Sequence, residues 1–408
     1  MAILTIKNIG PIKDVTLELN KVNVIMGPQC SGKSTIAKII SFCTWLEKKL
    51  TRGGAFCNEF NNVWLCKLLQ TYHRLNNGYF SDKSVIEYEG EYINYSFKGQ
   101  KSPSTGKENI KYKEVKKIYG SKIIYIPSER NFVSIMTDLE QYAKRSDNIQ
   151  DFIINWFEAK RTFGEDNKLS ILNLGIEYNS DSFDNDFITQ DNGVKLKLQT
   201  ASSGLQSVVP LLALFDYIST DMYGKSRPMS VQERDALIGK YNEMVKRKKE
   251  SEGAIDSNDL EMLLDLILSK NYTNSQFIIE EPEQNLFPST QRDLVYHLLK
   301  LITADRDHRL TVTTHSPYIL YALNNCMLGY LVNSQLQEEE KKEFLSKNFL
   351  SQNSWINPES VSIWEIEDGK LRNIQDKDNI ISENYFDIKM TELTDEYYQM
   401  FNYYKDEE

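Results

Sequence analysis

The pattern of apolar and polar positions divides the chain into strands that alternate with helices. Residues 3–7 and 15–19 alternate apolar and polar side chains on either side of Gly10, which predicts two short strands around a turn. Residues 22–26 are mostly apolar, as in a buried strand. A glycine-containing loop follows, and then apolar residues recur at helical spacing over 34–50. The beginning of the chain therefore predicts a strand, a loop and a helix in direct succession.

The rest of the chain continues this alternation. The expected elements are an aromatic-rich helical stretch at 55–80, a hairpin at 84–98, a loop at 99–117, a strand at 122–126, helices within 133–163, short strands within 169–199, a helix at 204–218, paired helices within 230–267, a strand at 276–279, a helix at 286–302, a strand at 310–314 and a hairpin-like stretch at 359–373. Pro210 is expected to kink the helix at 204–218 or to delay its start. Such alternation predicts an α/β fold with a largely parallel sheet.

Composition narrows the class of protein. The chain has 408 residues, 40% of them apolar, and a formal net charge of −10, and its mean hydropathy is −0.48. The longest apolar run, residues 208–215, is far shorter than the roughly 20 residues that span a bilayer. The N-terminus does not have the pattern of a signal peptide. We therefore expect a cytoplasmic protein that does not enter a membrane.

The five cysteines are widely spaced and form no Cys-x-x-Cys pair, so we expect reduced thiols rather than a disulfide framework or a zinc module. The acidic balance argues against a protein that coats nucleic acid nonspecifically, although it does not exclude a local basic groove.

One motif carries the candidate chemistry. The loop after the strand 22–26 matches G-x-x-x-x-G-K-[ST], and the candidate phosphate-binding residues are Gly27, Pro28, Gln29, Cys30, Ser31, Gly32, Lys33, Ser34 and Thr35. Glycines let such a loop approach a phosphate closely, and the backbone amides of the loop and helix N-terminus face its negative charge. Lys33 is expected to reach the β- and γ-phosphates and Ser34 to ligate magnesium. This motif predicts a nucleotide site.

Two later strands supply further candidates. Glu280 and Glu281 follow the apolar run 276–279, and His315 follows the strand at 310–314. Two adjacent carboxylates at the end of a strand can also have no catalytic role and only be hydrated by solvent, because burying them is costly. Beside a phosphate-binding loop, we expect Glu280 to serve the magnesium ion and Glu281 to act as the general base that activates water. Ligands bind at the carboxyl ends of parallel strands, so His315 is placed to sense the γ-phosphate.

In this order, these segments resemble the ATP-binding-cassette (ABC) ATPases, specifically the SMC, RecF and OLD-like branch. The opening residues, 3–35, look like that branch's N-terminal strands and Walker A motif. Residues 280–288, which read EEPEQNLFP, resemble its Walker B motif and D-loop, and His315-Ser316-Pro317 resembles its H-switch. Between them, Ser202-Ser203-Gly204-Leu205-Gln206 is similar to the ABC signature at the start of a helix.

The resemblance implies an α/β P-loop NTPase fold with a mixed N-terminal sheet, a parallel core sheet, a helical lobe and a helical insertion. It also implies a mechanism. Two heads would dimerise head to tail, with each ATP and its Mg²⁺ between Lys33 of one subunit and Ser203, Gly204 and Gln206 of the other. The chain would be a single ABC-ATPase head over 1–408. Its parts would be N-terminal strands and Walker A at 1–54, a helical and β lobe at 55–200, the signature helix at 201–220, a helical insertion at 225–270, Walker B to H-loop at 271–330, and a C-terminal extension with an acidic tail at 331–408.

The chain departs from the family pattern at three places. Glu280 stands where an aspartate is usual, and Phe287 stands where the D-loop usually has a polar residue. No glutamine follows the strand 122–126, and Arg130 in that region is a candidate phosphate contact. These departures leave open a nucleotide-gated scaffold that hydrolyses ATP slowly.

The insertion carries the densest basic run, Lys246, Arg247, Lys248 and Lys249. This run is either a solvated helix end or a surface that binds DNA or a partner.

Without a long coiled coil or a fused nuclease, the chain resembles ATPase subunits of bacterial anti-phage systems such as Septu, PARIS or retron cassettes. The resemblance implies a homodimer or higher homo-oligomer and a separately encoded effector, a nuclease or toxin. A DNA-repair ATPase of the RecF type is the alternative.

Overall fold

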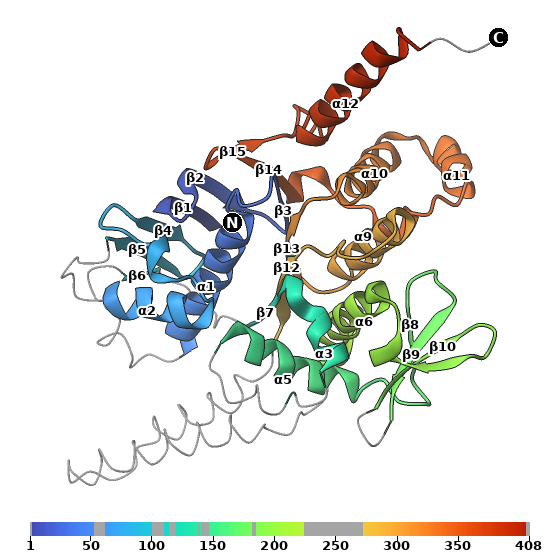
Figure 1. Cartoon of the computed structure of the whole chain (residues 1–408), viewed down its shortest axis with the longest axis horizontal. Coiled ribbons are helices and arrows are strands. Elements are labelled where there is room, and N and C mark those ends of the chain that lie inside the picture. Colours follow the sequence, from blue (N-terminus) through green and yellow to red (C-terminus); the bar gives the residue numbers. More distant parts are fainter. Residues whose placement is uncertain are drawn as a thin grey trace.

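A mixed sheet of 11 strands organises the molecule, in the order β6-β5-β4-β1-β2-β15-β14-β3-β13-β12-β7 (Figure 1). The computed structural model describes residues 2–52, 62–99, 110–113, 120–136, 139, 147–181, 185–223 and 272–404. The strands of the sheet are β1 (Ala2–Ile9), β2 (Ile12–Leu19), β3 (Val22–Met26), β4 (Val85–Glu89), β5 (Ile93–Lys98), β6 (Ile110–Tyr112), β7 (Ser121–Ile126), β12 (Asn274–Glu280), β13 (Arg309–Thr314), β14 (Val361–Glu367) and β15 (Lys370–Asn373).

Helices and a second sheet complete the described part of the chain. The helices are α1 (Lys33–Arg52), α2 (Asn62–Tyr72), α3 (Phe132–Ile135), α5 (Asn148–Lys160), α6 (Ser203–Asp216), α9 (Pro288–Ile302), α10 (Pro317–Gln335), α11 (Glu338–Ser346) and α12 (Tyr385–Phe401). The second sheet, in the order β11-β10-β9-β8, has the strands β8 (Leu169–Ser170), β9 (Ile176–Ser180), β10 (Asp186–Gln190) and β11 (Lys195–Lys197).

The central strands are buried on both faces. Along β3, Val24 and Met26 belong to one hydrophobic core, whereas Ile25 belongs to the other. The first core also contains side chains of α5, α6, α9 and α10, and the second contains those of α1 and of the β1–β2 and β4–β5 hairpins. Burial on both faces explains why β3 is apolar in sequence rather than strictly alternating.

The register of the parallel strands sets the position of the candidate site. β7, β12, β13, β3 and β14 pair in parallel. Thr314 pairs with Met26, and Thr313 pairs with Glu280. The carboxyl ends of β3, β12 and β13 therefore meet at one edge of the sheet, where the loop after Met26 begins.

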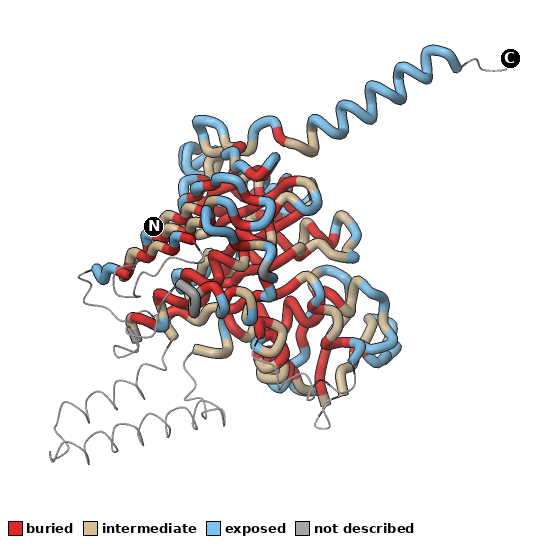
Figure 2. Tube along the Cα trace, turned by 60° about the vertical axis from the view of Figure 1, so that its left-hand side comes forward, coloured by how far each residue is buried: buried red, intermediate tan, exposed pale blue. Residues whose placement is uncertain are grey.

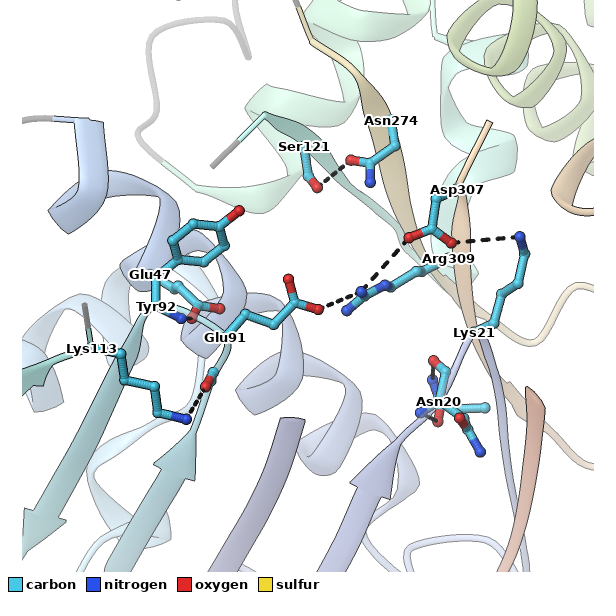
Figure 3. Close-up of polar contacts among 12 residues, drawn as sticks. Asn20, Lys21, Glu47, Glu91, Tyr92, Lys113, Ser121, Asn274, Asp307 and Arg309 are labelled. Carbon is cyan, nitrogen blue, oxygen red and sulfur yellow. Dashed lines mark hydrogen bonds and ion pairs between the residues drawn. The ribbon is translucent and has the colours of Figure 1, made fainter. Parts of the chain in front are cut away.

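At the opposite end of these strands, ion pairs join the N-terminal hairpins to the core (Figure 3). Arg309, the first residue of β13, lies 2.5 Å from Glu91 in the turn between β4 and β5. Asp307 lies 3.5 Å from Lys21, which precedes β3. These contacts fix the hairpin lobe against the core sheet at the end distant from the candidate site.

Most of the predicted elements are present, and three expectations need correction. The helical stretch expected at 55–80 ends at Tyr72, after which the chain turns toward β4. The expected loop at 99–117 contains the strand β6, which pairs with β5. The predicted insertion at 225–270, with Lys246, Arg247, Lys248 and Lys249, lies outside the described residues.

The third correction concerns Pro210, which does not delay its helix. α6 begins at Ser203 and continues through Pro210. A proline has no N–H for the carbonyl four residues earlier, here that of Gln206. Ser134 Oγ donates to this carbonyl at 2.9 Å, and Arg130 Nε donates to the neighbouring carbonyl of Ser207 at 3.2 Å. Partners outside the helix therefore compensate for the proline.

Among the described residues, none of the helices combines the length and the apolar character that a membrane crossing needs.

Candidate functional site

The loop between β3 and α1 has a backbone that requires glycine at two positions. Gly27 has φ +145°, and a Cβ there would lie 2.3 Å from the carbonyl oxygen of Ile366 in β14. Gly32 has φ +111°, and a Cβ there would lie 3.0 Å from the Ile12 side chain. Both dihedrals lie in the region where side chains are strained. The two motif glycines are therefore needed for the path of the loop as well as for access to a ligand.

The loop encloses the side chain of Lys33, the first residue of α1. Lys33 Nζ donates to the carbonyl of Gly27 at 2.9 Å and to that of Pro28 at 2.6 Å. Burial lowers the pKa of Lys33 to about 8, and the nearby carboxylates of Glu281 and Glu283 partly oppose this shift. An anion next to the ammonium group would favour its charged form. The nearby carboxylates therefore do not fully offset the cost of burying the Lys33 ammonium group.

Other features of the loop fit a bound phosphate. Ser31 Oγ is buried and has no hydrogen-bond partner among the described residues. The loop leads into the N-terminus of α1, a 20-residue helix whose dipole favours an anion at that end. Thr35 is buried, Ser34 is half-buried, and Gln29 and Cys30 are exposed at the tip of the loop. A nucleotide phosphate would supply the missing charge and a hydrogen-bond acceptor.

Glu281 and His315 lie beside this loop. His315 Nε2 is 3.4 Å from Glu281 Oε1, and the ring also hydrogen-bonds to the backbone of Gly27. Burial and the charge of Lys33 lower the pKa of His315, so the imidazole is neutral at pH 7. Lys33 at the start of α1, Glu281 after β12 and His315 after β13 therefore lie close together.

The backbone holds Glu281 in an uncommon conformation. Its φ is +43°, which is rare for a residue with a side chain. The N–H of Glu281 donates to the carbonyl of Thr313 at 2.9 Å, and its carbonyl accepts from Arg130 Nη2 at 2.8 Å. Both backbone groups are thus fixed, and the carboxylate is turned toward His315.

Glu283 supports this arrangement and was not among the predicted site residues. Its Oε1 accepts from Thr314 Oγ1 at 2.8 Å and from the N–H of His315 at 2.6 Å. Burial raises the pKa of Glu283, and its Oε2 has no hydrogen-bond partner among the described residues. The side chain connects the loop after β12 to the end of β13, which fixes the position of His315 relative to Glu281.

Glu280, the predicted magnesium ligand, is buried at the end of β12. Its Oε1 accepts a hydrogen bond from Tyr125 Oη at 2.5 Å. Burial and Glu280 itself raise the pKa of Tyr125 well above its usual value, so the phenol remains a donor. Tyr125 lies on β7, next to β12, and orients the carboxylate.

The candidate magnesium ligands fit this ion. The described residues contain no group of three or more His, Cys, Asp or Glu side chains that could hold a metal by themselves. Mg²⁺ does not need such a group, because it is usually bound by one or two protein oxygens, water and substrate phosphates. Glu280 and Ser34 supply a carboxylate and a hydroxyl of the required kind.

Arg130 is a correction to the sequence prediction, because it is not available to contact phosphate. Its guanidinium is fully buried. Its three nitrogens donate to five backbone carbonyls, those of Pro127, Ser207, Glu280, Glu281 and Pro282, at 2.8 to 3.3 Å. Burial lowers the pKa of Arg130 to about 10, which still leaves it charged at pH 7. Arg130 therefore fastens α6 to the loop that carries Glu281.

The residues that resemble a signature lie apart from Lys33. Ser203 is exposed at the N-terminus of α6. The side chain of Gln206 donates to the carbonyl of Gln199, and Gly204 packs against Asn285, rather than against the loop residues. A Cβ at Gly204 would lie 2.8 Å from the carbonyl oxygen of Asn285, so glycine is needed for close packing there. Within one chain, the described site therefore consists of the loop and the strand ends.

Comparisons with known proteins give likenesses of fold only. No family model matches the sequence, and no curated protein matches it. Among solved structures, the SMC head domain from Thermotoga maritima is 14% identical with a TM-score of 0.37, over 94% of this chain and 98% of that chain. The Smc head domain from Pyrococcus furiosus, bound to the C-terminal domain of ScpA, is 10% identical with a TM-score of 0.39, over 97% and 99%.

A third similar structure is the dimeric ATP-binding cassette MJ0796 bound to ADP and Pi. It is 12% identical with a TM-score of 0.29, over 91% of this chain and 99% of that chain. Likeness at these levels does not decide the activity, which has to be argued from the residues of the site.

Proposed function

We propose that the chain is an ABC-type P-loop ATPase that binds ATP with Mg²⁺ at residues 27–35 and hydrolyses it. The observation that carries this proposal is the convergence of Lys33, Glu281 and His315 at one edge of the sheet. A solvated strand terminus would not require a buried lysine, a buried second carboxylate and a histidine at the same place. A nucleotide site would bring these groups together, a lysine for the phosphates, carboxylates for the metal and the attacking water, and a histidine beside them.

Each of these side chains would have a separate role in ATP hydrolysis. Lys33 would exchange the carbonyls of Gly27 and Pro28 for phosphate oxygens and stabilise the charge that develops on them. Glu281 would accept a proton from the attacking water. His315 would hold the Glu281 carboxylate in place from the side of the loop. Mg²⁺, when bound through Glu280 and Ser34, would neutralise phosphate charge.

Tyr125→Phe tests the position of Glu280. The change removes the hydroxyl that Glu280 Oε1 accepts from and keeps the ring in the core. Loss of a hydrogen bond to a metal ligand commonly reduces metal affinity about 10- to 100-fold. We expect the Mg²⁺ concentration for half-maximal ATP hydrolysis to rise by about this factor. In the control Tyr88→Phe, which loses a hydrogen bond to Glu47, the Mg²⁺ dependence should not change. An unchanged Mg²⁺ dependence in Tyr125→Phe would exclude this positioning role.

We also propose that two heads assemble around ATP, with Ser203 and Gly204 of one subunit facing the loop of the other. The exposed N-terminus of α6 supports this arrangement, because its amides lie open to an anion.

The variant Ser203→Arg tests this assembly, since the long side chain would block approach of a second loop. With ATP and Mg²⁺, we expect the mass of the native protein to double relative to its nucleotide-free state. The mass of Ser203→Arg should not change although it still binds ATP. Light scattering measures the mass of each protein with and without ATP and Mg²⁺. An equal increase in mass in the native protein and in Ser203→Arg would contradict the head-to-tail geometry.

For the cellular role, we propose that the ATPase controls a separately encoded nuclease or toxin in anti-phage defence. The support is that the motifs at 27–35, 202–206 and 280–288 resemble the SMC, RecF and OLD-like branch, and that a head of this branch without a sustained heptad run resembles the ATPase subunits of such systems. The neighbouring reading frame should then encode the effector, and its product should bind this protein in one nucleotide state more strongly than in another.

A further inference from the structure

The helix α12 projects from the body of the protein into solvent (Figures 1 and 2). None of its residues is buried. Its base, however, is firmly held. Asn384 caps the helix together with Asp387, the N–H of Tyr385 donates to Glu365 Oε2 at 3.1 Å, and Tyr321 donates to Asp387. The helix is therefore presented in a fixed direction.

An apolar seam runs along α12 and just beyond its end. Its members recur at alternating spacings of four and three residues and are Phe386, Met390, Leu393, Tyr397, Met400 and Tyr404. Met390 and Leu393 are each 65% exposed and Tyr397 is 57% exposed. Alternation of three and four is the spacing at which one face of a helix meets a second helix in a coiled coil. Phe386, at the base of the helix, packs against the core of the protein. The seam residues beyond it are each more than half exposed, and they are Met390, Leu393, Tyr397, Met400 and Tyr404. The seam thus has the pattern of a helix interface.

An isolated helix of this length is marginal in water. α12 has 17 residues, only slightly more than the roughly 12 to 15 below which even alanine-rich helices are marginal, and most helices in proteins owe their stability to an apolar face packed on a neighbour. Its large exposed side chains give a further reason for a partner, because contiguous apolar surface on a soluble protein marks an interaction site.

The charged side chains next to the seam indicate which helix it pairs with. Lys389 and Glu396 occupy equivalent positions along the helix, one residue before Met390 and Tyr397 respectively. In an antiparallel pair, side chains at this position face the same position of the other helix. When Met390 packs against the partner's Leu393, Lys389 faces the partner's Glu396. Twofold symmetry forms the same ion pair a second time, between Glu396 and the partner's Lys389. A single register of the two helices therefore packs the apolar residues together and also pairs the opposite charges.

A parallel pair does not have this complementarity. In register, Lys389 would lie opposite the partner's Thr394, and Glu396 opposite the partner's Phe401. We propose that α12 is a homodimerisation element that pairs antiparallel with α12 of a second copy of this chain. The interface uses no nucleotide contact, so it is separate from the ATP-dependent assembly proposed above and would join such assemblies into larger ones.

The test is the mass of the full-length protein freed of nucleotide, measured by light scattering from about 1 to 100 µM. We expect a concentration-dependent dimer. Leu393→Glu places a charge in the seam and should raise the dissociation constant roughly 100-fold or more. The matched control Tyr398→Glu changes an exposed tyrosine of the same helix that lies outside the seam, and dimerisation should be retained. A wild-type monomer at 100 µM, or an unchanged dimer in Leu393→Glu, would overturn the proposal.

A charge exchange tests the orientation. Lys389→Glu and Glu396→Lys should each weaken the dimer about five- to tenfold, because two symmetric pairs become repulsive. Lys389 also pairs with Glu392 of its own helix at 2.8 Å, and Lys389→Glu removes that pair whether or not a dimer forms. The double variant Lys389→Glu/Glu396→Lys should therefore dimerise more tightly than either single variant, whereas a double variant as weak as the single ones would exclude the antiparallel pairing. Since nucleotide is absent throughout, these results do not depend on whether the chain hydrolyses ATP.

Discussion

Glu281→Gln is expected to lower steady-state ATP hydrolysis by about 10²- to 10⁴-fold, the usual contribution of a general base. The reason is that the amide cannot accept the proton of the attacking water. The backbone around this residue should not change, because its N–H and carbonyl keep their bonds to Thr313 and Arg130. Glutamine also has the same shape and the same tolerance of the observed φ of +43°.

The measurement is phosphate release by purified protein with saturating ATP and Mg²⁺. Glu87→Gln, the same substitution at an exposed position of β4 that pairs with Lys98, serves as the control and should keep the wild-type rate. A wild-type rate in Glu281→Gln would refute the assignment of the base. A rate that falls only because ATP no longer binds would assign the carboxylate to binding instead.

Arg130→Ala is expected to reduce the free energy of unfolding by about 3–5 kcal/mol, because each buried acceptor left without a donor costs about 1–3 kcal/mol where water cannot reach it. Five backbone carbonyls lose their donor, and those of Glu280 and Glu281 hold the loop of the candidate site. Arg130→Lys should recover only part of the stability, because an ammonium group offers three donors where the guanidinium offers five.

Urea denaturation measures this effect. Arg74→Ala is the matched control, since Arg74 forms an exposed ion pair with Glu129 and should contribute at most about 1 kcal/mol. A similar loss of unfolding free energy in Arg130→Ala and Arg74→Ala would contradict the proposal that Arg130 holds α6 against the loop after β12.

The part of the site that could be predicted from the sequence rests on local patterns. The glycines of residues 27–32, the buried strand before them and the helix after them are adjacent in the chain, so their geometry follows from short-range rules. Glu281 and His315 could be predicted because parallel strands end at a common edge. The register of Thr314 with Met26 places them as expected.

The remaining features depend on contacts between residues far apart in the chain. Arg130 looked like a phosphate ligand because of its position after β7, but four of its five carbonyl partners lie 77 to 152 residues away. Tyr125 and Glu283 act through neighbours that only the folded sheet brings together. The seam of α12 has a 3–4 pattern in the sequence, but it lies within a segment rich in acidic residues, and the acidic tail expected there is largely a helix.

The central claim is that ATP binds at the loop that encloses Lys33. Its most direct test is calorimetric titration of ATP with Mg²⁺ into Glu281→Gln protein, in which turnover does not interfere, compared with Glu281→Gln/Lys33→Ala. The predicted result is one ATP bound per chain in the first protein and at least a tenfold weaker affinity in the second. Absence of binding in the first protein, or equal affinity in the two, would contradict the account.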